Sequence, residues 1–229
     1  MNKVKRASQF GRSMIEMLGV LAIIGVLSVG GIVGYTKAMM KFKINKAINQ
    51  IVEIQQNIKQ AYAHEKGYSG LNVYTSEETL KVVKALNLVP QEMIDENSTL
   101  TSSDMDYPAY IINPFGGGVQ LGSDLRTDAK TFVINYWGLP REACVALASY
   151  NWLSLGNLTS ISVRSYVYTD LYGETDFNDG EKYIEDEDSF WAGNIDKYPY
   201  LMPLPLDKIA KACDCPDNTC EVIWGFKEP

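Results

Sequence analysis

Residues 11–35 read GRSMIEMLGVLAIIGVLSVGGIVGY and hold one carboxylate, Glu16, near the start of an otherwise apolar run. From Met17 to Tyr35 there are 19 residues without a charged side chain. At 1.5 Å per residue, this length crosses most of a bilayer core of roughly 30 Å. A carboxylate in such a segment costs roughly 2.5–3.5 kcal/mol at the bilayer centre and less near the interface. The stretch therefore predicts a membrane-spanning helix whose acid has a partner.

A short basic leader, MNKVKRASQF, precedes the string GRSMIE at positions 11–16. This leader, Gly11, Glu16 and the apolar helix after them resemble the class III signal of type IV prepilins. The resemblance implies that a membrane peptidase cuts after Gly11 and that Glu16 becomes the fifth residue of the mature chain. The family usually has Phe, Met or Leu directly after the cut. Arg12 departs from that pattern, which bears on N-methylation of the new terminus.

The charges near the predicted cut agree with this resemblance. Cleavage frees an α-amine at Arg12, and Glu16 of one subunit can pair with the amine of a neighbour. A one-residue slip between the two helices would leave both charges unpaired, so the pair also favours one register. The alternative is an ordinary signal anchor, in which Glu16 lies at the level of the lipid headgroups. A cleaved secretory signal peptide fits less well, because the apolar run is too long.

The apolar residues after Tyr35 recur at three- and four-residue steps on one helical face. They are Ile44, Ile48, Ile51, Ile54 (or Gln55), Ile58 and Tyr62. No Pro or Gly interrupts the chain before Gly67, which supplies a stop signal. We therefore expect one helix from Ser13 to Lys66, apolar all round in its first half and amphipathic in its second. The pair Gly30-Gly31 predicts a local loosening when this helix leaves lipid for a filament.

Length and composition allow one globular domain after the helix. The predicted organisation is a leader at 1–11, the membrane or filament-core half of the helix at 12–35, its amphipathic half at 36–66 and a head at 67–229. Hydrophobic residues make up 46% of the chain and the net charge is −7. An acidic surface of this kind is a poor partner for nucleic acid, which requires clustered Lys and Arg.

The head mixes short helical and strand patterns. A capping box at Thr75 to Glu78 predicts a helix over 76–86, and Pro140 can open a second helix. Alternating apolar residues predict strands at 119–121 and 130–137, and two further strands are expected at 161–169 and 221–226. The expected fold class is α+β, with the long N-terminal helix packed on an antiparallel sheet. The turn at 113–117 and the segment 140–144 resemble the heads of type IVb pilins, although the short leader departs from that class.

Four cysteines, Cys144, Cys213, Cys215 and Cys220, allow three disulfide pairings. A bond from Cys213 to Cys215 closes too small a loop for relaxed geometry. Cys144 should therefore join Cys213 or Cys215, with Cys220 taking the other, and the bonds bound a region at about 144–220. A zinc site is the alternative, but the spacing C-x-C-x4-C is unusual for zinc. Disulfides would place the head outside the cytoplasm, whereas the four basic residues on each side of the span do not decide its orientation.

Other candidate sites carry weaker signals. The acidic segment 176–188 is a candidate calcium loop, but the register of its Gly180 does not fit an EF-hand, and a solvated loop is favoured. Asn97-Ser98-Thr99 and Asn157-Leu158-Thr159 match the glycosylation acceptor pattern, a short match of little weight. His64, the only histidine, is expected on the surface. No nucleophile–base pair, phosphate-binding loop or metal cluster is recognisable, so we expect no enzyme, no cofactor and no metal site.

These patterns and the resemblance to type IV prepilins together imply a type IV pilin-like structural subunit. Its partners would be further copies of itself in a helical polymer, the prepilin peptidase, the assembly machinery of the inner membrane, and membrane lipid before assembly. It would lie in the bacterial inner membrane with its head outside the cytoplasm, and later in a surface pilus. The alternatives are a minor pilin, a type II secretion pseudopilin, or a membrane-anchored binding protein that does not polymerise.

Overall fold

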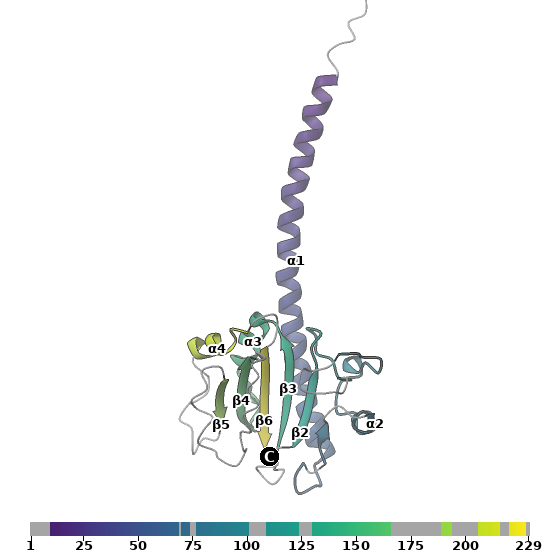
Figure 1. Cartoon of the computed structure of the whole chain (residues 1–229), viewed down its shortest axis with the longest axis vertical. Helices are drawn as coiled ribbons and strands as arrows, with labels where there is room; N and C mark the ends of the chain where they lie inside the picture. Colours follow the sequence, from purple (N-terminus) through teal and green to yellow (C-terminus); the bar gives the residue numbers. More distant parts are fainter. Residues whose placement is uncertain are drawn as a thin grey trace, which may run out of the picture. The chain divides into compact units, whose positions relative to one another are not determined.

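The computed structural model of this chain describes residues 10–68, 70–73, 77–100, 109–123, 130–165, 189–193, 206–215 and 220–227. The chain divides into two compact units, residues 1–42 and 43–229. One helix, α1 (Phe10–Ala61), contributes to both of them. The second unit holds the remaining helices and a six-stranded sheet, all of whose strand pairs are antiparallel (Figure 1). The predicted α+β fold class is confirmed.

Helix α1 begins three residues before the predicted start and ends five residues before Lys66. The chain leaves the helix in a turn, where the amide of Glu65 donates to the carbonyl of Tyr62 at 3.0 Å. It turns back because Tyr68, only 2% exposed, packs its ring 4.7 Å from the ring of Phe132 on the sheet. The helical pattern at the end of α1 is thus overridden by an aromatic contact with the head.

After α1 the described chain alternates between strands and helices, beginning with strand β1 and ending with strand β6. The helices are α2 (Glu77–Ala85), η1 (Gln91–Met93), α3 (Arg141–Ala148), η3 (Trp152–Leu155) and α4 (Leu206–Ala212). The strands are β1 (Asn72–Val73), β2 (Val119–Ser123), β3 (Thr131–Leu139), β4 (Leu158–Ser165), β5 (Ser189–Gly193) and β6 (Cys220–Lys227). Strand β5 and helix α4 were not predicted, and β4 begins three residues before Ile161. Thr75 of the predicted capping box and residues 166–169 of the predicted strand lie outside the described residues.

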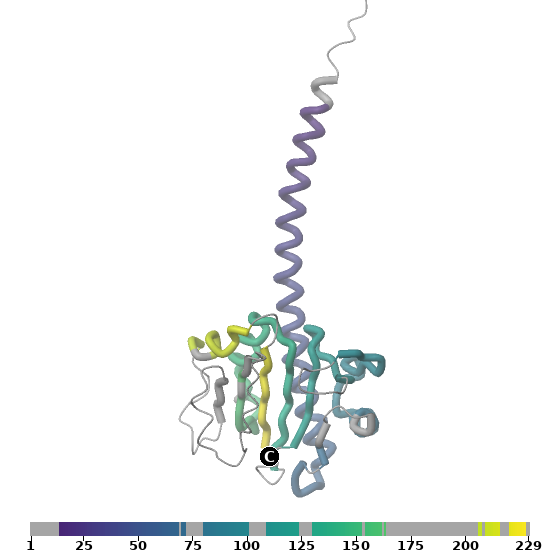
Figure 2. The backbone as a smooth tube through the Cα atoms, in the orientation of Figure 1, coloured from purple at the N-terminus to yellow at the C-terminus, as the bar shows by residue number. Residues whose placement is uncertain are grey.

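The C-terminal strand β6 occupies the middle of the sheet, whose order is β1-β2-β3-β6-β4-β5. Figure 2 shows it as the yellow tube between β3 and β4. Six of its eight residues are buried, including Val222, Trp224 and Phe226 at 0% exposure. Burial on both faces is the environment that a nearly continuous apolar run predicts for a central strand. Strand β6, the last of the described strands, therefore joins the two halves of the sheet.

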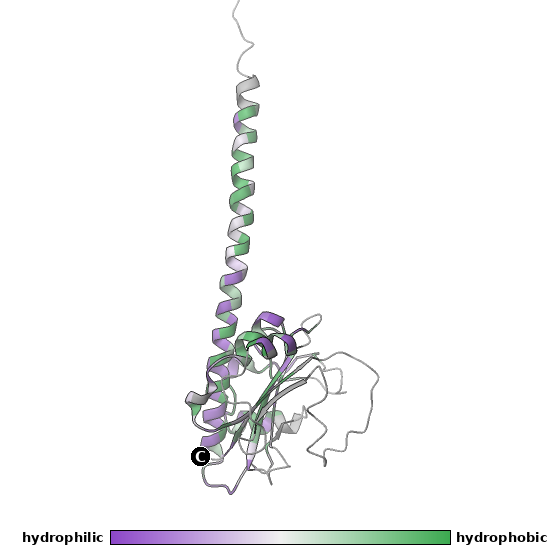
Figure 3. Ribbon diagram, turned by 90° about the vertical axis from the view of Figure 1, so that its left-hand side faces the viewer, coloured by the Kyte–Doolittle hydropathy of each residue, from purple (hydrophilic) through white to green (hydrophobic). Residues whose placement is uncertain are grey.

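The core lies between the sheet and the part of α1 that belongs to the second unit (Figures 1 and 3). The isoleucines of the predicted stripe are buried, whereas Tyr62 at its end is half-buried. These isoleucines are Ile44, Ile48, Ile51, Ile54 and Ile58, none of them more than 9% exposed. Full burial of one such side chain stabilises the fold by roughly 1.5–3 kcal/mol. Aromatic rings complete the core, where Tyr136 of β3 and Trp152 of η3 are both in edge contact with Trp224 of β6.

The predicted turn after Asn113 is fixed by that side chain. Its Oδ1 accepts from the amides of Phe115 at 2.9 Å and Gly117 at 3.2 Å, and its Nδ2 donates to the carbonyl of Trp137 at 2.8 Å. A Cβ on Gly117 would lie 1.9 Å from the Trp137 carbonyl oxygen. Glycine is therefore required at Gly117 because two backbones meet there. The contact lies beside an irregularity in the register of β3, where Gly138 has a φ of +72°.

Candidate functional site

The apolar half of α1 is exposed along its whole described length. Every side chain from Met14 to Ala38 is exposed within the chain, and an 18-residue window has a mean hydropathy of 2.4. Among the described residues, this helix alone is long and apolar enough to span a membrane, judged by length and composition. Figure 3 shows the change from mostly hydrophobic to mixed colouring along it. So large an apolar surface requires lipid or another protein surface as its neighbour.

Polar side chains inside this apolar segment are of two kinds. The hydroxyl of Ser28 donates to the carbonyl of Ile24 at 2.7 Å, and that of Thr36 donates to the carbonyl of Val33 at 3.0 Å. The helix itself therefore satisfies both hydroxyls, as lipid requires. Glu16 is exposed, and within the described part of the chain it has no ion pair or hydrogen bond. The acid is thus a charged group in an apolar segment and has no partner among the described residues.

Gly11 and Arg12, the predicted processing site, lie in the first turn of α1, which begins at Phe10. Their backbones are helical here. Most of the predicted leader, residues 1–9, lies outside the described residues. The predicted cut, between Gly11 and Arg12, therefore lies at the start of the helix that also carries Glu16. Glu16 is four residues beyond Arg12.

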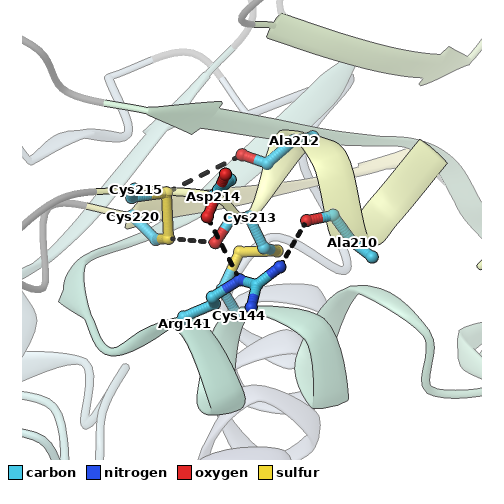
Figure 4. Close-up of polar contacts among 8 residues, drawn as sticks. All are labelled: Arg141, Cys144, Ala210, Ala212, Cys213, Asp214, Cys215 and Cys220. Atoms are coloured by element: carbon cyan, nitrogen blue, oxygen red, sulfur yellow. Dashed lines mark hydrogen bonds and ion pairs between the residues drawn. A yellow bond between two sulfur atoms is a disulfide. The ribbon is translucent and has the colours of Figure 1, made fainter. Parts of the chain in front are cut away.

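The four cysteines form two disulfides, Cys144–Cys213 and Cys215–Cys220 (Figure 4). The structure thus selects the first of the two pairings that the sequence left open. Cys144 lies on α3 and Cys213 directly follows α4, and their Cα atoms are 5.8 Å apart. The second bond joins the chain after α4 to the first residue of β6, with a Cα–Cα distance of 5.3 Å. Together the two bonds tie α3, α4 and the central strand to one another.

Polar contacts around these bonds are weak. Arg141 Nε lies 3.4 Å from Asp214 Oδ1, and both side chains are more than half exposed, so the pair contributes little to stability. Cys220 Sγ lies 3.5 Å from the Cys213 carbonyl oxygen, but a disulfide sulfur has no hydrogen to donate. Figure 4 shows these contacts at one side of the bonds. The covalent links, together with the burial of Cys144, Cys213 and Cys220, hold the region.

Comparison with known proteins places the chain in a family. A family model described as PilS N terminal matches residues 34–182, which is more than half of the chain. The chain belongs to this family. The match begins at the end of the apolar segment, so Gly11, Arg12 and Glu16 of this PilS-family chain lie outside it.

Two curated relatives are each named the major structural subunit of the bundle-forming pilus, from Escherichia coli O127:H6 and Escherichia coli O111:H-. Each is 28% identical over 141 residues, which cover 62% of this PilS-family chain and 64% of the relative. The chain thus spans less than two thirds of their length. The crystal structure of TcpA, a type IV pilin from Vibrio cholerae El Tor, aligns with a TM-score of 0.44 and 19% identity, over 80% of this chain and 98% of that one. The predicted resemblance to type IV pilins, with a head most similar to the IVb class, is confirmed by the family match and the curated relatives.

Sequence reasoning missed one buried polar link of this PilS-family chain. Gln55 Nε2 donates to Asn157 Oδ1 at 2.8 Å, and Asn157 Nδ2 donates to the Lys227 carbonyl at 3.0 Å. These bonds join α1 to the turn before β4 and to the end of β6. The position of Gln55 on the apolar stripe was a usable signal, because a buried amide requires a partner. Its partner Asn157, 102 residues away in the sequence, could not be identified from the sequence alone.

A second polar group is buried on the sheet. The Asn135 amide on β3 donates to Gln120 Oε1 on β2 at 3.1 Å and also to the carboxylate of Glu221 on β6. All three residues are no more than 8% exposed. Nearby, burial raises the pKa of the Tyr136 phenol well above its usual value of 10. These buried groups fix the alignment of β2, β3 and β6.

Among the residues that the structure describes, the remaining candidates do not form a chemical site. His64 is exposed beyond the end of α1. Within the described ranges, no group of three His, Cys, Asp or Glu side chains could hold a metal ion. The acidic segment 176–188, the candidate calcium loop, lies outside the described residues.

Proposed function

We propose that this chain is a structural, non-catalytic subunit of a type IV pilus or a related filament. The observation that carries the proposal is the exposed apolar half of α1, with Glu16 as its one acid lacking a partner. Family membership and the pilus-subunit relatives support it. The exposed face is first covered by membrane lipid and then by the same face of other copies, so one helix serves as anchor and as filament core.

Processing and assembly follow from the positions of three residues. A prepilin peptidase cuts after Gly11 and frees the α-amine of Arg12, with or without methylation. Glu16 of one subunit then pairs with that amine on a neighbour, and each charge removes the other's desolvation cost. Because the two groups lie four residues apart, the pair offsets neighbouring helices by about 6 Å along their axes.

The proposed location changes during the life of the subunit. Before assembly it lies in the bacterial inner membrane as a single-pass protein, with the head outside the cytoplasm. The two disulfides support this orientation, because such bonds persist in oxidising compartments. Assembly proteins of the inner membrane then transfer the subunit into a surface filament of identical copies.

The experiment that tests the proposal replaces Glu16→Leu in the full-length chain. We expect the variant to stay in the membrane fraction, to keep both disulfides and to yield no sheared filaments. Glu65→Leu, which removes an exposed carboxylate beyond the end of α1, is the matched control and should leave filament recovery unchanged. Unchanged filaments from the Glu16 variant would refute the charge pairing. Mass spectrometry of the mature chain should find Arg12 as its first residue, and an intact leader would refute the processing step.

A further inference from the structure

The two Asn-x-Ser/Thr sequences of the chain differ sharply in their surroundings. Asn157 is 3% exposed, and both ends of its amide are engaged, by Gln55 Nε2 and by the carbonyl of Lys227. Its Nδ2 can reach a reagent only if the link between α1, β4 and β6 opens. The folded chain therefore excludes Asn157 as a modification site.

Asn97 has the opposite environment. It lies in an exposed turn, in which the Ser98 amide donates to the Asp95 carbonyl at 3.2 Å and the Asn97 amide donates to Asp95 Oδ1 at 3.1 Å. Ser98 Oγ accepts from the amide of Leu100 at 3.2 Å, which holds the chain after the turn. In the described part of the chain, no hydrogen bond engages the Asn97 side-chain amide. The turn is thus built by the neighbours of Asn97, and its Nδ2 and the exposed Thr99 are left to a partner.

Charge separates the two sequences as well. Asp95 stands two residues before Asn97, whereas Leu155 stands two residues before Asn157. The other acid of the turn, Glu96, forms an ion pair with Lys84 of α2. Asp95 carries no such ion pair among the described residues, and its exposed carboxylate gives an enzyme with a basic acceptor groove a charged contact.

We propose that Asn97 is an acceptor site for N-linked glycosylation by a bacterial oligosaccharyltransferase. The co-substrate is an oligosaccharide linked to a polyprenyl diphosphate. Asn97 Nδ2 forms a bond to the anomeric carbon, the bond from that carbon to the diphosphate oxygen breaks, and polyprenyl diphosphate leaves. The amide nitrogen gives up one proton to the enzyme's base, and no oxidation occurs. The inference rests on the proposed function in one respect, the placement of the head outside the cytoplasm.

The test uses the full-length chain produced in a bacterium that carries an oligosaccharyltransferase and a lipid-linked oligosaccharide of known mass. We expect the purified protein to gain the mass of one glycan, on the peptide that contains Asn97. Asn97→Gln and Thr99→Ala should each abolish the gain. Thr159→Ala, which destroys the other acceptor sequence without touching Asn157, should keep it. Asp95→Asn retains an oxygen that can accept the turn's hydrogen bond but loses the charge, and we expect at least a tenfold lower occupancy.

The state of the cysteines separates this inference from the proposed function. If both disulfides are formed and no glycan mass is added, the head has reached the compartment of the glycan donor without being modified. That result overturns the glycosylation site alone. A glycan on Asn157 would also overturn it, because the buried amide would then be the better acceptor. Four free thiols in the unreduced protein would show that the head never left the cytoplasm, and would overturn both proposals.

Discussion

Removing the Cys144–Cys213 bond should destabilise the head more than removing the Cys215–Cys220 bond. The first bond joins residues 69 apart in the sequence, and the second joins residues only 5 apart. Loop-closure entropy makes the long link worth about 4 kcal/mol and the short link about 2 kcal/mol, because the unfolded chain loses more freedom to a longer loop. The difference of about 2 kcal/mol is a large share of a total stability of 5–15 kcal/mol.

The assay is guanidinium unfolding of the full-length protein in detergent, followed by tryptophan fluorescence. Trp152 and Trp224 are both no more than 1% exposed, so unfolding of the head changes their environment. The paired variants Cys144→Ala/Cys213→Ala and Cys215→Ala/Cys220→Ala each leave the other bond intact. Equal losses of unfolding free energy, or a larger loss from the short link, would refute the loop-entropy argument.

Three further predictions concern single side chains of the head. Gly117→Ala should destabilise the head by several kcal/mol or prevent its folding, because its Cβ would meet the Trp137 carbonyl oxygen at 1.9 Å. The control Gly116→Ala places its Cβ in open space at a φ of +91°, and it should cost only about 1 kcal/mol in the same assay. Asn157→Ala should lower the unfolding free energy by about 1–3 kcal/mol, because it removes one buried and one part-buried hydrogen bond and leaves the buried Gln55 amide without this acceptor. Tyr136→Phe should be neutral or stabilising at pH 7, because the buried hydroxyl makes no hydrogen bond in the described part of the chain. Because the pKa of the Tyr136 phenol is raised in the folded protein, the unfolded chain ionises first, and stability falls as the pH rises above about 10. The Phe variant should therefore lose stability less steeply at alkaline pH. Equal slopes of stability against pH would contradict the argument.

Much of the fold is readable from local sequence pattern. The apolar run from Met17 to Tyr35, the isoleucine stripe, the alternation in β3 and the apolar run of β6 are each a local pattern of one element. Their boundaries fall within a few residues of the prediction, except at the end of α1. There the ring of Tyr68 packs on Phe132, a residue 64 positions away, and no local signal predicts that contact.

The candidate site divides in the same way. The positions of Gly11, Arg12 and Glu16 follow from a short motif beside an apolar helix, and their processing and pairing remain proposals. The choice between two disulfide pairings, by contrast, depends on where α4 brings Cys213 relative to Cys144 on α3. Helix α4 itself was not predicted.

The sequence by itself determined the long helix, its change from apolar to amphipathic, the acid within it and the α+β class, because these depend on side-chain chemistry repeated at helical or strand spacing. The tertiary structure decided the central place of β6, the disulfide pairing, and the burial of Asn157 against the exposure of Asn97. Each of these depends on residues far apart in the sequence meeting in space. Two identical acceptor patterns thus become one structural amide and one open turn, a distinction that only packing makes.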